Sequence, residues 1–142
     1  IWLNSWPHEV VMQAWRQSCI ALAPSGWPEP FGLVVIEAMA TGRPVIASRT
    51  GGLPDIVIDG ETGLLVPPGD PGALRLALER LLADPELRER MGQAGKHRVA
   101  KFQANTVVPR IEQVYQTVLA QGRQNRTGSQ PPEERYPNAE IQ

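Results

Sequence analysis

Residues 23–40 read APSGWPEPFGLVVIEAMA, and the interpretation of the whole chain starts from this stretch. Its first half contains three prolines and a glycine, which break regular structure, whereas from Gly32 onward helix-compatible apolar residues carry a single charge, Glu37. The pattern predicts a loop that runs into a short helix buried on most sides. A carboxylate in such a helix needs a partner, because unpaired buried charges are costly.

The start of this predicted helix suits an anionic ligand. Gly32 has no Cβ, so a ligand can approach the backbone, and the first N–H groups of a helix have no intrahelical acceptor. At ~1.5 Å per residue, Glu37 lies ~7–8 Å along the helix axis from Gly32. One extended ligand could therefore meet Glu29 in the loop, the free amides and Glu37. Vicinal hydroxyls and a diphosphate, as in a nucleotide sugar, match these groups.

Composition limits the class of protein. The 142 residues, 42% of them hydrophobic, are enough for one domain with a core. A net charge of −1 gives no electrostatic argument for binding nucleic acid or an anionic membrane surface. The single cysteine, Cys19, is interpreted as a small buried side chain in a reducing compartment. Without an apolar run of ~20 residues or a signal peptide, we expect a cytoplasmic protein.

Apolar runs and turn residues predict alternating strands and helices. Short apolar runs predict parallel strands at 19–23, 45–47 and 64–66. Helices are predicted over 7–17, after Gly32, and over 53–57. Since ligands in such sheets lie at the carboxyl ends of the strands, both Glu29 and the Gly51-Gly52 turn are expected at that edge.

The second half of the chain is predicted to be helical. Asp70-Pro71 and Asp84-Pro85 each combine an N-cap residue with proline at the first helical position, so a helix should begin at each pair. A last helix is predicted from Asn105 or Thr106 to about residue 119, with Pro109 tolerated only in its first turn. Residues 122–142 are polar and are expected to form a disordered tail.

The central stretch resembles the E-x7-E signature of retaining glycosyltransferases of the GT-B fold, especially those of family 4. The resemblance continues through GRPVIA (42–47), TGGLPDIV (50–57) and DGETGLLV (59–66). It is dense over residues 20–70 and weaker to about 119, and four linked motifs in this order make it specific. It implies an α/β fold, a Rossmann-like three-layer sandwich with a parallel sheet. Residues 1–121 would form part of the C-terminal, nucleotide-sugar-binding half of the GT-B fold.

The resemblance also implies an activity, that of a retaining hexosyltransferase. Such enzymes move a sugar from a UDP-, GDP- or ADP-sugar to an acceptor hydroxyl, commonly without a metal or other cofactor. Glu29 would be the catalytic-site residue beside the donor sugar, as a positioning group rather than a nucleophile, and Glu37 would bind the ribose. The residues assigned to donor binding are Glu29, Phe31, Gly32, Leu33, Glu37, Thr50, Gly51 and Gly52.

Several of these assigned residues could instead have a purely structural role. Glu37 could be an acid paired with Arg43 or Arg49, and Glu29 an exposed loop carboxylate. The turn at residues 50–52 could be an ordinary glycine turn that needs positive φ. His8 is expected to be exposed and without a role.

The resemblance covers only part of an enzyme. In the family, an Arg–Lys pair that meets the leaving phosphate and an N-terminal acceptor domain both precede the matched region, so we expect this chain alone to be inactive. The acceptor, whether sugar, lipid or protein, stays open, as do the donor base and a peripheral membrane association of the full enzyme. An open sheet edge would favour self-association. The alternatives are a non-catalytic nucleotide-binding or interaction module, or part of a GT-B sugar epimerase or phosphorylase relative.

Overall fold

The computed structural model describes residues 5–127, with side chains described for residues 5–121. It contains two units, Ile1–Gln103 and Ala104–Gln142, which are described separately. The first unit contains a parallel sheet with the strand order β1-β2-β3. These strands are β1 (Ala21–Ala23), β2 (Val45–Ser48) and β3 (Gly63–Val66). The predicted α/β class with a parallel sheet is confirmed.

Helices precede, connect and follow these strands. They are α1 (His8–Gln17), α2 (Leu33–Ala40), α3 (Leu53–Ile56), α4 (Pro71–Ala83), α5 (Pro85–Val99) and the 3-10 helix η1 (Ala100–Phe102). The two predicted N-caps are confirmed, because Asp70 Oδ1 accepts a hydrogen bond from the N–H of Ala73 (2.9 Å). Asp84 Oδ1 likewise accepts one from the N–H of Leu87 (2.8 Å).

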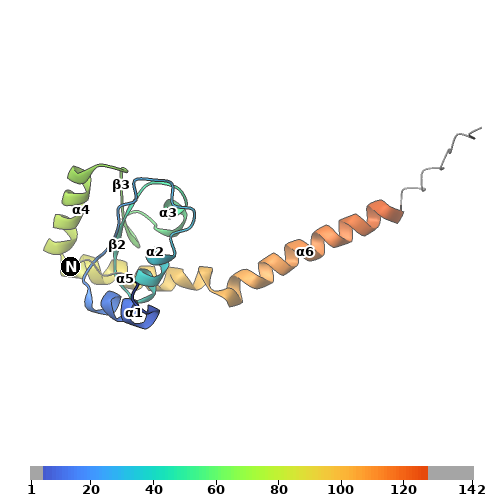
Figure 1. The fold of residues 1–142 in the computed structure, drawn as a ribbon, viewed down its shortest axis with the longest axis horizontal. Helices are drawn as coiled ribbons and strands as arrows, with labels where there is room; N and C mark the ends of the chain where they lie inside the picture. Colours follow the sequence, from blue (N-terminus) through green and yellow to red (C-terminus); the bar gives the residue numbers. More distant parts are fainter. Residues whose placement is uncertain (1–4, 128–142) are drawn as a thin grey trace, which may run out of the picture. The chain divides into compact units, whose positions relative to one another are not determined.

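Helices cover both faces of the sheet and give it three layers. Successive side chains of a strand point to opposite faces, and along β2 the fully buried Val45 and Ala47 pack in one core cluster with Met39 of α2. Ile46 between them packs in a second cluster with Leu81 of α4. In Figure 1, α2 and α4 accordingly lie on opposite sides of the strands.

Helix α5 contributes to both core clusters. Its Met91 belongs to the cluster on the α4 side, whereas Val99 belongs to the cluster on the α2 side. Between them, Gly92 packs on the turn that precedes β2, where a Cβ would lie 2.1 Å from the carbonyl oxygen of Gly42. Helix α5 therefore closes the amino edge of the sheet, opposite the edge at which a ligand was expected.

One expectation about burial holds only in part, and another is wrong. Helix α2 is buried or half-buried from Val35 to Ala40, whereas its first two residues, Leu33 (66%) and Val34 (44%), are exposed. Cys19 is exposed rather than buried. The reason is that β1 begins only at Ala21, which leaves Cys19 in the connection before the strand.

The second unit is described as one helix, α6 (Ala104–Thr127). It continues past the boundary predicted at residue 122, so residues 122–127 are helical, and the rest of the predicted tail lies outside the described residues. Pro109 lies inside the helix rather than in its first turn. It removes one backbone hydrogen bond from the helix, since proline has no N–H. Among the described residues, no helix combines the length and hydropathy needed to cross a membrane.

Two glycines of α5 provide a matched test of how this helix packs. Gly92→Ala is expected to lower the free energy of unfolding by about 2 kcal/mol or more, because overpacking against backbone cannot be relieved by a side-chain movement. At Gly95 the nearest atoms are those of the Met39 side chain, at 3.5 Å, which is ordinary contact. Gly95→Ala should therefore be neutral or stabilise the protein by up to about 1 kcal/mol through helix propensity. Urea unfolding of both variants measures the difference, and equal effects would contradict the packing described for α5.

Candidate functional site

Two loops meet at the carboxyl edge of the sheet, one after β1 and one after β2. The N–H of Gly52 donates a hydrogen bond to the carbonyl oxygen of Glu29 (2.8 Å). A Cβ on Gly51 would lie 2.2 Å from that same oxygen, and one on Gly52 would lie 2.6 Å from the carbonyl oxygen of Pro30. The structure thus brings the Gly51-Gly52 turn directly onto the backbone around Glu29. The glycines have a packing reason to be present, whether or not they also face a ligand.

Gly32 forms the boundary between this loop and α2. It is the N-cap residue of α2 with φ +77°, and a Cβ there would lie 2.5 Å from Cδ2 of Leu53 in α3. Leu53 of α3 therefore fills the space left by the missing side chain of Gly32. The sequence suggested that a ligand could reach the backbone through that space, but it is occupied.

The amino end of α2 nevertheless keeps free donors. No side chain among residues 5–121 caps it, and the first backbone bond runs from the N–H of Val35 to the carbonyl of Gly32 (3.0 Å). The N–H groups of Leu33 and Val34 precede that bond, as at any helix start. An anion can bind there, because these donors and the helix dipole both favour negative charge.

A support for the loop comes from the end of α5, which sequence reasoning missed. The ring of Phe31 meets that of Phe102 edge to face, with centroids 6.2 Å apart. Arg98 lies over the Phe102 ring at 5.8 Å, and it donates hydrogen bonds to the carbonyl oxygens of Asp55 and Ile56 in α3. The charge pattern of α5 indicated only a solvated face, and nothing near Arg98 in the sequence points to α3.

Glu37 faces α1 rather than an arginine. Its Oε1 lies 3.5 Å from Nδ1 of His8, with side-chain exposures of 31% for Glu37 and 65% for His8. Arg43 instead donates to the carbonyl oxygen of Arg16 (2.7 Å), and Arg49 pairs with Asp59. The structural explanation that paired Glu37 with Arg43 or Arg49 is therefore wrong. His8 is exposed as expected, but it has a charged partner.

The remaining predicted residues have mixed exposure. Glu29 and Thr50 are half-buried, whereas Phe31 and Leu33 are exposed. The edge thus offers half-buried carboxylates, an uncapped helix start and an apolar rim. Within residues 5–127, no group of three or more His, Cys, Asp or Glu side chains is placed to hold a metal ion.

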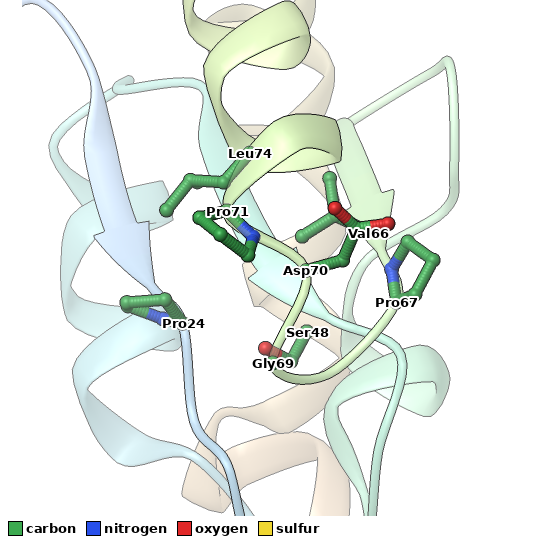
Figure 2. Close-up of a pocket in the computed structure, with 8 residues that line it drawn as sticks. All are labelled: Pro24, Ser48, Val66, Pro67, Gly69, Asp70, Pro71 and Leu74. Carbon is green, nitrogen blue, oxygen red and sulfur yellow. The ribbon is translucent and has the colours of Figure 1, made fainter.

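A separate hollow lies at the same edge of the sheet, beside α4. Its empty volume is about 450 Å³, including space open to solvent. Figure 2 shows Pro24 across the hollow from Pro71 and Leu74, with Ser48 and Asp70 also on its wall. The hollow is lined by none of the residues assigned to donor binding. The sequence indicated only a strand end and an N-cap at residues 67–71.

The chain is similar in sequence to known transferases. Residues 1–98 match the family described as "Glycosyl transferases group 1". The chain is 42% identical over 113 residues to the D-inositol 3-phosphate glycosyltransferase of Corynebacterium diphtheriae, covering 80% of this chain and 26% of that protein. It is also 42% identical over 109 residues to the phosphatidyl-myo-inositol mannosyltransferase of Mycobacterium leprae, covering 77% and 29%. The chain belongs to the group 1 glycosyltransferase family.

Solved structures show the same fold. Sucrose-phosphate synthase from Thermosynechococcus elongatus superposes with a TM-score of 0.77 at 43% identity, covering 84% of this chain and 30% of that one. Anabaena HepE in complex with UDP-glucose gives a TM-score of 0.71 at 26% identity, covering 75% and 30%. Because these are GT-B enzymes, the prediction of a partial C-terminal GT-B half is confirmed. The chain spans less than a third of each of these four proteins.

Two glycines make it possible to separate the effect on stability of the contact between the two loops from the effect of backbone strain. Gly51 (φ +54°) and Gly60 (φ +79°) both have a positive φ, but around Gly60 no atom of the described residues lies within 4 Å of an added Cβ. Alanine at either position costs about 1–2 kcal/mol for the left-handed backbone. Gly51→Ala should lose clearly more stability and move the amide resonances of residues 29–33 in NMR spectra. If Gly60→Ala is as destabilising and the resonances stay in place, the contact between the loops is not as described.

Proposed function

We propose that this chain is the donor-binding part of a retaining hexosyltransferase, which transfers a sugar from a nucleoside-diphosphate sugar to an acceptor hydroxyl. One observation carries the proposal: the fold matches a GT-B protein crystallised with UDP-glucose. The uncapped start of α2, which follows the loop after β1, agrees with it. The transferase names of the relatives favour this activity over an epimerase, a phosphorylase or a non-catalytic module.

The proposed donor lies along the edge from Glu29 to Glu37. Its diphosphate is held by the N–H groups at the start of α2, where the helix dipole contributes about 0.3–1 kcal/mol to binding an anion. Leu33 and Glu37 are four residues apart and share one helix face, so the Glu37 carboxylate lies one turn beyond the amides. It accepts hydrogen bonds from the ribose hydroxyls, and Glu29 accepts them from the sugar.

The chemistry proposed for this site is electrostatic. The bond between the anomeric carbon and the phosphate oxygen breaks, the sugar becomes oxocarbenium-like, and negative charge develops on the leaving diphosphate. The acceptor oxygen bonds to the anomeric carbon from the same face, and the proton of the acceptor hydroxyl passes to the leaving phosphate oxygen. Preorganised amides at the α2 start stabilise that charge without reorganising, which is the arrangement that accelerates such reactions. Glu29 and Glu37 position the donor, and we propose that no metal takes part. Further basic groups and the acceptor site belong to the whole enzyme, which we propose to be cytoplasmic.

Separate roles for the two carboxylates can be tested with nucleotides that do or do not carry a sugar. UDP, GDP and ADP and their sugar conjugates are titrated onto the chain, with binding followed by NMR shifts because these report millimolar affinities. Glu37→Gln should weaken the nucleotide and its sugar conjugate alike, by about tenfold or more, because a charge-assisted hydrogen bond is lost. Glu29→Gln should weaken only the sugar conjugate.

A control carboxylate is available in the exposed Glu61. Glu61→Gln should leave every affinity unchanged. If no nucleotide binds at millimolar concentration, or if Glu37→Gln binds as tightly as the unmodified chain, the proposed donor site is contradicted. Equal losses from Glu29→Gln with and without the sugar would overturn the division of roles.

A further inference from the structure

His8 provides a titratable group beside the proposed ribose carboxylate. It is the first residue of α1, and its Nδ1 lies 3.5 Å from Oε1 of Glu37 on α2. That separation is an ion-pair distance rather than a good hydrogen bond, so the interaction depends on the charge of the imidazole. An imidazole changes its charge between about pH 5 and pH 8.

Two carboxylates belong to the elements around His8. Glu37 is the charged partner from α2, and Glu9 is the neighbouring acid on α1 itself. Arg16 lies in the last turn of α1, and Arg43 reaches the carbonyl oxygen of that residue, at the far end of the helix from His8. A protonated His8 thus adds a positive charge beside the Glu37 carboxylate.

We propose that His8 is a positioning residue whose protonated form pairs with Glu37 and strengthens donor binding. This rests on the function proposed above, in which Glu37 lies one helical turn from the amides that hold the diphosphate. With His8 neutral, the full negative charge of Glu37 repels the diphosphate, and no other side chain among the described residues pairs with its carboxylate. With His8 protonated, the pair is close to neutral, the repulsion is reduced and the carboxylate is held in place.

The sign of the pH dependence follows from this arrangement. Donor affinity should rise as the pH falls, because a proton on His8 adds a positive charge beside Glu37. A single exposed charge at roughly 8–10 Å from a diphosphate changes its affinity by about three- to fivefold at low ionic strength, with less at high salt. The probe is the nucleotide sugar that binds best in the titrations described above. A nucleotide sugar is used because the terminal phosphate of a free diphosphate itself titrates near pH 6.

Two substitutions at this exposed helix start fix the charge at position 8, one as positive and one as neutral. His8→Lys keeps a positive charge throughout, so its affinity at pH 8 should stay close to the value of the unmodified chain at pH 5.5. His8→Asn is neutral throughout and should show the weaker affinity at both pH values. The unmodified chain should have the weaker affinity at pH 8 and the stronger affinity at pH 5.5. If His8 had only a structural role, the two variants would show the same pH dependence as the unmodified chain.

The second histidine of the sequence is the control. His97 is exposed on α5, and His97→Asn should keep the pH profile of the unmodified chain. If His8→Asn and His8→Lys both keep that profile, or if the unmodified chain shows no pH dependence, the inference is overturned while the proposed function stands. If no nucleotide sugar binds at any pH, the proposed function fails, and this inference fails with it.

Discussion

The site depends on the close packing of one glycine turn against the loop that precedes α2. Gly51 and Gly52 lie on the backbone of Glu29 and Pro30, at distances where any side chain would collide with carbonyl oxygens. The same segment then continues into α3, whose Leu53 fills the space beside Gly32. Residues 51–53 therefore hold residues 29–32 at both ends. The hydrogen bond from Gly52 fixes the backbone of Glu29. Only the side chain of Glu29 is left free to change conformation.

Helix α5 connects this arrangement to the opposite edge of the sheet. Its middle packs on the turn before β2 through Gly92, and its last turn carries Arg98, which binds the end of α3. Phe102 follows in η1 and packs against Phe31. A helix that looks like a charged surface element in sequence thus supports both α3 and the loop. A shift in the position of α5 would therefore move residues 29–32 through the contact between Phe102 and Phe31 and through the hydrogen bonds of Arg98 to α3.

The sequence predicted local structure well, because local structure depends on near neighbours. The strands, the Asp-Pro helix starts and the loop-to-helix stretch of residues 23–40 all follow from apolar runs, caps and breakers within a few residues. The family resemblance located the loops that meet at the carboxyl edge. Their assignment to a bound donor stays a prediction.

What the sequence could not supply are the contacts between distant segments. Arg98 and Asp55 are 43 positions apart, and the pairing of His8 with Glu37 depends on how α1 packs on α2. Two local expectations about burial also depend on tertiary structure. The sequence predicts that Cys19 opens a buried strand and that α2 is buried on most sides, but Cys19 and the first two residues of α2 are exposed, because burial is decided by where neighbouring elements end.

The exposed apolar side chains around the α2 start have a physical reason under the proposed function. Trp27, Phe31, Leu33 and Val34 lie on one loop and the helical turn that follows it, and all are exposed. In a folded domain such a concentration of apolar surface marks a binding surface more often than a defect. Bound against a diphosphate, these side chains would exclude water and lower the local dielectric, which strengthens the hydrogen bonds from the α2 amides. A bare phosphate would gain little binding energy from these side chains, whereas a nucleoside and a sugar would gain more because their apolar faces can pack against them. The combination of free amides with an apolar rim therefore favours a nucleotide sugar over a simple anion.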